Sequence, residues 1–550
     1  MPRRRTVAGV PADLATIARD VGSLLAMQGG LMALSVTVAV LAREPYAAAA
    51  FLLAAALTAA VGLGTRRRFA EAPEPRMKHG MVVAAAGWFA TATFGALPFL
   101  LTAHLTPPAV AAGFVPAGAD YAASSLGVFR NPLHALFESM SGWTGSGLTM
   151  APHEPSLPRA IQWWRSLIQY VGGVGVIVLT VSILSRPGSG SYALYRSETR
   201  EERIHPSVVS TVRTVWKIFL LYTLLSVVVL FLAIRASEYG STLPLRQAGW
   251  QALNHAMTAL STGGFSVTDN SVATYGSPLI ETVLLPVMTL GAIAFPVHYG
   301  VLANRNPRRL LTDLQTRWLF VLLLVGALAL SAQNLLTLPA GAFSGSASDA
   351  GLPFLGLSAA GTDAVRDSTF QFVSALTCTG FQSAPIREWA AGGKLLLAGA
   401  MTLGGAAGST VGGLKIVRGY TIVRGIEWQF SRVFLPANAV VNARIDGRLL
   451  DRETMEREFS EAAIVSLLWL ILLAASSLLL VNLAGPEFTY ADALFEVASA
   501  QGNVGLSTGI TGPTMSPLAK GAFVLNMWIG RLEIIPVLVF VRSALYGLDP

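Results

Sequence analysis

The segment Ser141–Met150 reads SGWTGSGLTM, and three related glycine-bearing segments follow it along the chain. They read ALSTGGFSV (Ala259–Val267), ALTCTGFQS (Ala375–Ser383) and AQGNVGLSTG (Ala500–Gly509). We call all four the glycine loops. Their pivotal glycines Gly147, Gly264, Gly380 and Gly505 are 117, 116 and 125 residues apart. This period is longer than that of solenoid repeats, and it predicts four similar hairpins arranged around one axis.

The composition is that of an integral membrane protein. Hydrophobic residues make up 53% of the 550 residues and charged residues only 13%, about half the charged fraction of soluble domains. The start MPRRR is followed by an apolar run longer than a signal-peptide core, which favours a retained first span. Helices long enough to cross the bilayer are predicted at Val21–Ala42, Tyr46–Gly64, Gly80–Ala103, Ser166–Ser185, Trp318–Leu336 and Ala463–Gly485.

Several classes of function are excluded by what the chain lacks. The single cysteine, Cys378, excludes an internal disulfide, and its place in the third glycine loop predicts a packing or backbone role. Seven scattered histidines give no HExxH motif, so no metal enzyme is expected. The net charge of +8 comes without interleaved aromatic residues, which argues against nucleic-acid binding. We therefore expect no enzyme, no catalytic residues and no nucleic-acid partner.

The basic residues cluster where predicted spans end, and these ends fall on one side if the spans alternate. The positive-inside rule then places both termini in the cytoplasm. The clusters are Arg3–Arg5, Arg66–Arg68, Arg186–Arg203, Arg305–Arg309 and Lys415–Arg432. Trp163 and Trp164 beside Arg165 are interpreted as part of a membrane-interface belt.

With this topology the chain divides into two leading spans and four units of outer helix, re-entrant helix, glycine loop and inner helix. The predicted boundaries are 1–76 for the leading segment and 77–205, 206–312, 313–445 and 446–550 for the units. The re-entrant helices are predicted at Pro132–Gly142, Trp250–Leu260, Arg366–Leu376 and Ala491–Ala500, each too short to span. A short helix and the loop that follows it enter a membrane only when they are surrounded by protein or by a water-filled cavity. The alternative is that they are ordinary extracellular loops or interfacial helices.

The glycine loops have the composition of a cation filter. Backbone carbonyls that meet on an axis can replace the hydration shell of a cation, and glycine tolerates the required backbone angles. The polar residues Glu138, His255, Gln371 and Glu496 on the re-entrant helices are expected to anchor them by hydrogen bonds more than to bind ions. The predicted filter residues are Thr144, Gly145, Ser146, Gly147, Thr262, Gly263, Gly264, Cys378, Thr379, Gly380, Asn503, Val504 and Gly505, with the cation at the four pivotal glycines.

Two features lie in the predicted inner helices. Residues 402–413 carry Gly404, Gly405, Gly408, Gly412 and Gly413, a pattern typical either of close helix packing or of a broken, flexible helix. Arg531 is expected near the middle of a span over Phe523–Phe540, where a charge is costly unless it faces water or a partner. It is interpreted either as neutralised by Glu533 or by helix-end carbonyls, or as a positive barrier below the filter.

The chain resembles the Trk/Ktr/HKT superfamily of potassium transporters, and within it the bacterial TrkH branch, from about Val21 to Tyr546. Besides the four glycine loops, the resemblance rests on WWRSLIQYVGGVGVIVL (Trp163–Leu179), LGAIAFPVHY (Leu290–Tyr299), TLGGAAGSTVGGLK (Thr402–Lys415) and GRLEIIPVL (Gly530–Leu538). The two leading spans are similar to the TrkH arrangement. The expected fold is therefore an all-α polytopic membrane protein with two leading helices and four tandem helix–re-entrant loop–helix units in pseudo-fourfold symmetry around one pore.

The resemblance implies more than the residues alone do. It implies a K⁺-preferring filter in a bacterial cytoplasmic membrane, a homodimer, and a cytosolic ring of TrkA/KtrA-like RCK subunits that carries the regulatory nucleotide. It also implies that residues 402–413 are an intramembrane gating loop, with Ser409 and Thr410 facing the ion path, and that Arg531 acts with it.

Three functions follow from this sequence. The first is a gated, channel-like pore for K⁺ uptake driven by the membrane potential. The second is a K⁺ symporter coupled to H⁺ or Na⁺, and the third is a scaffold or membrane enzyme without transport. Coupled carriers usually show inverted repeats and intramembrane carboxylates. Here the four repeats run in one direction and the inner helices have no buried Asp, which favours the pore.

Overall fold

The computed structural model describes residues 6–184, 208–337, 343, 358–434, 443–445 and 448–548. Within them the protein is helical apart from two short antiparallel hairpins, β1 (Thr6–Val7) with β2 (Val10–Pro11) and β3 (Ala443–Ile445) with β4 (Arg448–Leu450). Six described helices are long and apolar enough to cross a membrane, or up to eight spans if each of two bent helix pairs counts as one. The predicted all-α membrane architecture is confirmed.

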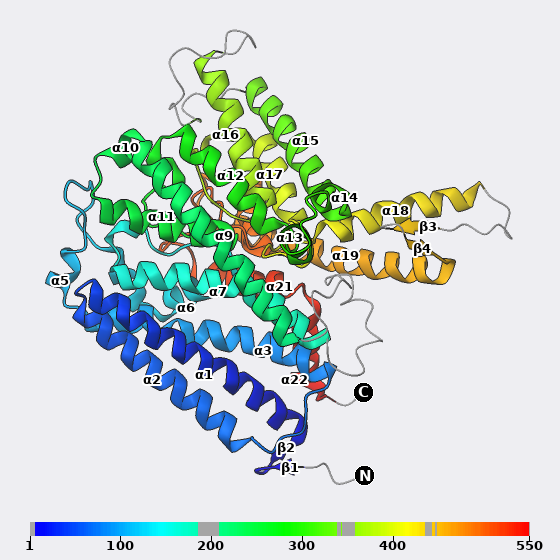
Figure 1. The fold of residues 1–550 in the computed structure, drawn as a ribbon, viewed down its shortest axis with the longest axis horizontal. Coiled ribbons are helices and arrows are strands. Elements are labelled where there is room, and N and C mark those ends of the chain that lie inside the picture. Colours follow the sequence, from blue (N-terminus) through cyan, green and yellow to red (C-terminus); the bar gives the residue numbers. More distant parts are fainter. Residues whose placement is uncertain are drawn as a thin grey trace.

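The two leading helices form a tight hairpin at one side of the molecule (Figure 1). They are α1 (Ala12–Leu41) and α2 (Pro45–Arg68). A Cβ atom added to Gly22 would lie 2.8 Å from the carbonyl oxygen of Gly62, so only small residues allow this approach. The two predicted leading spans are confirmed, although α1 begins nine residues before Val21.

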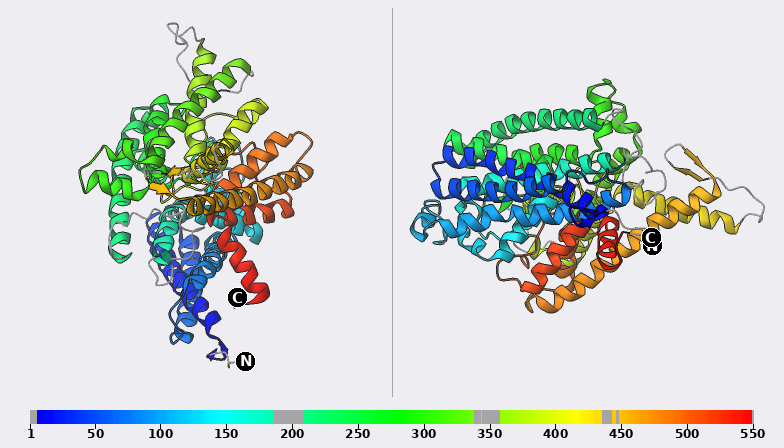
Figure 2. Two further views of the ribbon diagram at one scale, coloured as in Figure 1. Left: turned by 90° about the vertical axis from the view of Figure 1, so that its right-hand side faces the viewer. Right: turned by 90° about the horizontal axis from the view of Figure 1, so that it is seen from below.

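The remaining helices form four units that follow one another along the chain (Figure 2). Short helices α5 (Pro108–Ala112), α10 (Glu238–Ser241) and α14 (Arg309–Thr312) lie in the connections. The outer helices are α3 (Met77–Gly95) with α4 (Leu97–Leu105), α9 (Val208–Ala236), α15 (Leu314–Thr337) and α19 (Arg452–Leu483). The re-entrant helices are α6 (Pro132–Thr144), α11 (Leu245–Leu260), α16 (Ala359–Leu376) and α20 (Tyr490–Gly502). The inner helices are α7 (Arg159–Leu184), α12 (Pro278–Ala292) with α13 (Phe295–Leu302), α17 (Ala391–Leu403) with α18 (Ile416–Val433), and α21 (Pro517–Arg531) with α22 (Ile535–Tyr546).

Two re-entrant helices begin earlier than predicted. Helix α11 starts at Leu245 instead of Trp250, and α16 starts at Ala359 instead of Arg366. The prediction followed the apolar residues, whereas helix starts are set by the residues that cap them. In α16 the cap is Ser358, whose hydroxyl accepts a hydrogen bond from the backbone N–H of Gly361 at 3.1 Å.

The inner helices of the second, third and fourth units are broken. The α12–α13 pair is bent by 107° and the α21–α22 pair by 113°. The expectation of one continuous span over Phe523–Phe540 is therefore wrong, because α21 ends at Arg531. Glu533 and Ile534 have positive φ values of 57° and 66°, and a right-handed helix needs negative φ at every residue.

A ring of polar contacts joins each unit to the next, and we call it the bracing ring. In every unit the fourth residue of the inner helix contacts the re-entrant helix of the following unit, and the fourth unit contacts the first. The ring is therefore closed. The pairs are Gln162 Oε1 with Trp250 Nε1 (2.7 Å), Glu281 Oε2 with Arg366 Nε (3.1 Å), Lys394 Nζ with Asp492 Oδ1 (2.6 Å) and Lys520 Nζ with His134 Nε2 (2.7 Å).

The outer surface of the bundle is apolar and its interior carries much of the polarity, the reverse of a soluble protein. The exposed side chains of α9 include Leu220, Leu224, Val228 and Leu232. Helices α18 and α19 with the β3–β4 hairpin project from the bundle as one arm (Figure 1). The apolar surface is what a hydrocarbon environment requires, since lipid tails offer no hydrogen bonds.

The bracing ring yields a prediction for stability. Lys394→Met leaves the carboxylate of Asp492, which is 4% exposed, without its cation. Because an uncompensated buried charge costs on the order of 3–5 kcal/mol, we expect a clear fall of the unfolding midpoint in detergent. The double variant K394M/D492N removes both charges and should recover part of the loss. Additive effects of the two single substitutions in this cycle would contradict the coupling.

Candidate functional site

The four glycine loops have the same backbone shape. Each follows the C-terminal end of a re-entrant helix, and its pivotal glycine adopts a positive φ. The residue two positions earlier is also left-handed, with φ of 74° at Gly145, 51° at Thr262, 51° at Cys378 and 56° at Asn503. A β-branched residue such as Thr262 rarely adopts this conformation. Strain of this kind persists only where surrounding contacts enforce it, and it often marks a functional site.

The loops contact one another in a closed ring. A Cβ atom added to a pivotal glycine would lie against the carbonyl oxygen just before the pivotal glycine of the next loop. The same relation leads from the fourth loop back to the first. In order, Gly147 meets the oxygen of Gly263, Gly264 that of Thr379, Gly380 that of Val504, and Gly505 that of Ser146. The structure thus brings the predicted filter residues together around one axis.

A backbone hydrogen bond holds each loop to its re-entrant helix, and the residue that accepts it is a Ser or Thr in every copy. This residue lies six positions before the pivotal glycine, and its carbonyl oxygen accepts a hydrogen bond from the residue before that glycine. The four N–H···O distances are 2.8 to 2.9 Å. The pairs are Ser141 with Ser146, Thr258 with Gly263, Ser374 with Thr379 and Ser499 with Val504. These residues were not predicted from the sequence, although a Ser or Thr occurs six positions before the pivotal glycine in all four copies.

The polar residues nine positions before the pivotal glycines anchor the outward side of each loop. Glu138 accepts hydrogen bonds from the hydroxyl of Thr149 and the backbone N–H of Met150. Glu496 binds the fourth loop in the same way through Thr508 N–H, at 2.7 Å. In the other two loops His255 contacts Ser266 and Gln371 contacts Ser383. The anchoring role predicted for these four side chains is confirmed.

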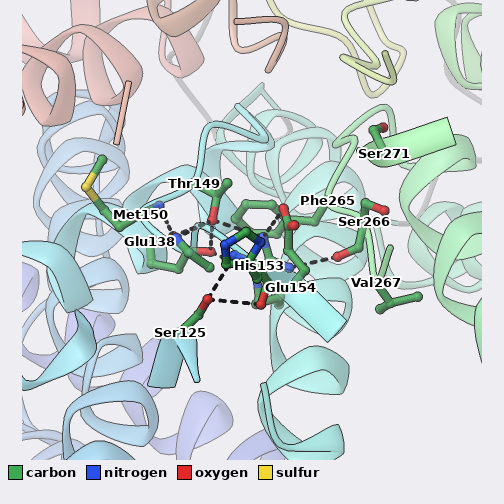
Figure 3. Close-up of polar contacts among 12 residues, drawn as sticks. Ser125, Glu138, Thr149, Met150, His153, Glu154, Phe265, Ser266, Val267 and Ser271 are labelled. Carbon is green, nitrogen blue, oxygen red and sulfur yellow. Dashed lines mark hydrogen bonds and ion pairs between the residues drawn. The ribbon is translucent and has the colours of Figure 1, made fainter. Parts of the chain in front are cut away.

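Arg165 on α7 ties the first two glycine loops together. Its Nε atom pairs with Glu138 Oε1 at 2.7 Å, and its other nitrogens donate to Thr149 Oγ1 at 3.1 Å and to the carbonyl oxygen of Ser266 at 2.8 Å. Figure 3 shows Glu138, Thr149 and Ser266 converging on this point. The guanidinium also lies 4.1 Å from the ring centroid of Phe265, so one buried cation holds two loops.

The prediction of an interface belt at this place is wrong for two of its three residues. Arg165 is 1% exposed, and Trp164 is fully buried, with its Nε1 atom donating to the carbonyl oxygen of Gly95 at 3.1 Å. The sequence pattern of Trp beside Arg is typical of a bilayer surface, but here the partner carboxylate, Glu138, draws the arginine into the protein interior.

The side chains that flank the pivotal glycines bond to one another. Thr144 and Ser146 share a hydroxyl contact of 3.0 Å, and Asn503 Nδ2 donates to Ser146 Oγ at 2.8 Å across the first and fourth loops. Thr379 bonds to the hydroxyl of Thr377 at 2.8 Å. Cys378 is buried and has a φ of 51°, which agrees with the predicted packing or backbone role. These contacts fix the walls of the ring without any metal-binding cluster of His, Cys, Asp or Glu in the described residues.

Residues 404–415 break the third inner helix and cross beneath the second loop. The backbone N–H and the hydroxyl of Thr410 both bond to the carbonyl oxygen of Gly291, at 3.2 and 2.9 Å. The same hydroxyl contacts Thr262 Oγ1 at 2.9 Å, which joins the segment directly to a predicted filter residue. Phe295 N–H donates to the carbonyl oxygen of Gly408 at 3.0 Å, and Ser409 Oγ bonds to Ala406 within the segment.

The glycines of this segment permit close backbone approach. A Cβ at Gly404 would collide with the carbonyl oxygen of Gly412, and one at Gly412 with that of Gly502 in the fourth loop. Gly404, Gly408 and Gly413 have positive φ values, and Gly405 accepts a hydrogen bond from Ile416 N–H. Of the two interpretations of residues 402–413, the broken helix is confirmed and regular helix packing is not.

Arg531 is held by carbonyl oxygens between the first unit and the broken segment. Its guanidinium donates to Thr410 O at 2.8 Å and to Gly172 O at 3.0 Å, and it is 5% exposed. A Cβ at Gly145 would be 3.8 Å from Arg531 Nη1, which places the charge beside the first loop. Carbonyl oxygens of the break and of the middle of α7 therefore bind the guanidinium, which keeps its positive charge. Glu533 instead pairs with Arg418 at 2.8 Å.

The chain is similar to one known protein family over most of its length. The family model described as TrkH, cation transport protein, matches residues 79–545. The chain belongs to the TrkH cation transport family. This family comprises transporters, so the expectation that the chain is not an enzyme is confirmed.

Individual TrkH relatives match most of the chain. An uncharacterized cation transporter of Methanocaldococcus jannaschii is 29% identical over 85% of this chain and 83% of its own length. The Trk system potassium uptake protein TrkH of Salmonella typhimurium is 27% identical over 95% of this chain and 97% of its own. The crystal structure of the potassium transporter TrkH from Vibrio parahaemolyticus superposes with a TM-score of 0.75, at 23% identity, over 97% of this chain and 99% of that one. The TrkH fold therefore includes the leading helix pair.

The ring of loops in this TrkH family member generates a prediction with an internal control. Gly380→Ala places a methyl group against the carbonyl oxygen of Val504, where the backbone cannot yield without opening the ring. We expect loss of most cation flux in liposomes. Gly399→Ala, at an exposed position of α17 with no atom within 4 Å of its Cβ, should leave flux unchanged and favour the helix by up to about 1 kcal/mol. Equal flux in both variants would contradict the close-approach argument.

Proposed function

We propose that the chain takes up K⁺ across the bacterial cytoplasmic membrane through a gated, channel-like pore, with both termini in the cytoplasm. The observation that carries the proposal is the closed ring of four glycine loops, in which each pivotal glycine lies against a carbonyl of its neighbour. Rings of backbone carbonyls replace the hydration shell of a cation in selectivity filters. K⁺ is also the ion named for the Salmonella and Vibrio relatives.

In this proposal the filter consists of residues 144–147, 262–264, 378–380 and 503–505. The four re-entrant helices direct their C-terminal ends, which carry partial negative charge, toward the ring and so favour a cation there. One charge that falls through a potential of 100 mV gains about 2.3 kcal/mol, which suffices to drive uptake without a coupled ion. Flux into liposomes of purified protein with a K⁺ gradient alone tests this. A requirement for an H⁺ or Na⁺ gradient would instead indicate a symporter.

We further propose that residues 402–413 form the gate and that Arg531 is its electrostatic part. The segment lies under the second loop through the contact of Thr410 with Thr262, and Arg531 is bonded to the same Thr410. Movement of the segment would therefore move the arginine with it. A positive charge beside the first loop repels cations in a region of low dielectric constant, where charge interactions are weakly screened.

The chain's proposed partners are a second copy of itself and a cytosolic ring of TrkA/KtrA-like RCK subunits, with the regulatory nucleotide on those subunits. The arm formed by α18 and α19 supports this, because it projects from the bundle (Figure 1) and exposes both charge and apolar surface. Phe430, Val433 and Phe434 on it are 66 to 83% exposed. Of the basic segment Lys415–Arg432, Arg424 and Arg432 are partly exposed on this arm, whereas Lys415 and Arg418 are buried. Residues 186–203 lie outside the described residues.

Selectivity provides a test of the filter assignment. Gly147→Ser adds a side chain where the first loop meets the carbonyl of Gly263, so the ring would be widened at one seam. We expect the preference for K⁺ over Na⁺ to fall by a factor on the order of ten, equivalent to about 1.4 kcal/mol. The ratio is measured from ion fluxes in liposomes. Gly127→Ser, which meets no atom within 4 Å, is the control, and an unchanged ratio for Gly147→Ser would remove this loop from the filter.

The barrier role of Arg531 has its own measurement, flux per folded protein. Arg531→Ala removes the positive charge and should raise cation flux several-fold, and deletion of residues 404–412 should raise it further by removing the obstruction. Because Glu533 keeps its pair with Arg418, the substitution does not strand a carboxylate. Arg531→Lys retains the charge and should keep flux near that of the wild type. Flux at or below wild type for Arg531→Ala, with normal expression, would contradict the barrier.

A further inference from the structure

A cavity separate from the ion path lies between the leading helix and the first unit. It has a volume of about 440 Å³ and is bounded by α1, α3, the end of α6, and α7. This volume is within the range of pockets that bind small molecules. Its wall on α1 extends from Arg19 to Leu31, twelve residues or about 18 Å along the helix axis. That length is close to one leaflet, since the hydrocarbon core of a bilayer is about 30 Å thick.

The chemistry of the cavity changes along its length. At the end nearest the N-terminus it is lined by Arg19 and Asp20, whose side chains form an ion pair of 3.0 Å and remain about one fifth exposed. Further along α1 the wall is mainly apolar, with Leu24, Met27 and Leu31, and it also includes the polar side chains of Ser23 and Gln28. Met27 is 62% exposed, so this wall reaches the lipid-facing surface of the bundle. The cavity therefore has one charged end and a mainly apolar interior that lipid can enter.

We propose that this cavity binds one zwitterionic phospholipid of the membrane, with an acyl chain along α1 and the headgroup at Arg19 and Asp20. The adjacent positive and negative side chains match the phosphate and ammonium groups of phosphatidylethanolamine. An anionic headgroup would be attracted by Arg19 but repelled by the carboxylate of Asp20, whereas Asp20 attracts the ammonium group of a zwitterionic headgroup. The inference rests on the proposed membrane orientation, in which this lipid belongs to the cytoplasmic leaflet.

The inner end of the cavity lies behind the first glycine loop. Trp143, which directly precedes Thr144 of the predicted filter, is part of the cavity wall. Trp88 lines the cavity as well, and its Nε1 atom donates to the carbonyl oxygen of Trp143 at 3.3 Å. An acyl chain in the cavity packs against both indoles and so supports the backbone that leads into the loop. The lipid thus acts on the filter from behind, without entering the ion path.

The test is native mass spectrometry of the purified full-length protein after incubation with equal amounts of phosphatidylethanolamine and phosphatidylglycerol. The wild type should retain one phosphatidylethanolamine per protomer after extended detergent washing. Met27→Trp fills the cavity from its exposed wall and should lose this lipid. Leu34→Trp is the matched control, because Leu34 is 57% exposed on the same helix but does not line the cavity, and it should retain the lipid.

A second variant covers the case in which Met27→Trp fails to fold. Arg19→Gln leaves the apolar wall intact and removes the partner of the phosphate, so retention should fall at least several-fold. Equal retention in wild type, Met27→Trp and Arg19→Gln, or no retained lipid in the wild type, would overturn the site. Exclusive retention of phosphatidylglycerol would overturn the headgroup assignment. Lipid retention is measured without ion flux, so this outcome is independent of whether the proposed K⁺ uptake is correct.

Discussion

The whole architecture depends on the approach of four backbone loops so close that none of the pivotal positions can carry a Cβ atom. Each pivotal glycine meets a carbonyl oxygen of the neighbouring loop, and the contacts close on themselves. Backbone brought together in this way gains little from apolar burial, so other contacts must hold it. Four sets of contacts hold the loops together. They are the backbone hydrogen bonds to the re-entrant helices, the polar anchors such as Glu138, the bonds from Arg165 to two loops, and the bracing ring.

Features that depend on a single residue position could be predicted from the sequence, whereas contacts between residues far apart in the sequence could not. The need for glycine at a crowded position is local, so its repeat predicted four units and brought together residues hundreds of positions apart. The bracing ring is not local, because the same geometric place is filled by a Gln–Trp contact in one seam and by a Lys–Asp ion pair in another. No single residue type recurs at these positions in all four copies, so the bracing ring is not visible as a sequence repeat. Likewise, the burial of Arg165 depends on Glu138, a residue 27 positions away in another helix.

The breaks in the inner helices of the second and fourth units could have been predicted from their prolines, Pro296 and Pro536. Helix α12 ends four residues before Pro296, and α22 begins one residue before Pro536. A proline disfavours helical backbone in the residue before it, so AFP and IIP within the quoted motifs already indicated interruptions. The break after α17 was one of two interpretations of its glycines, and only the family resemblance favoured it over close helix packing. The exact angle of each bend depends on tertiary contacts such as that between Phe295 and Gly408.

The cyclic order of the units has a consequence for biosynthesis. Three seams of the bracing ring join neighbours along the chain, but the fourth joins His134 to Lys520, 386 residues apart. At about 5–20 residues per second, a ribosome needs roughly 20–80 s to make the chain between them. During that interval the first re-entrant helix and its loop have a neighbour on one side only. The fourth unit therefore closes the bracing ring, and a chain that stops short of Lys520 leaves the seam between the fourth and first units open.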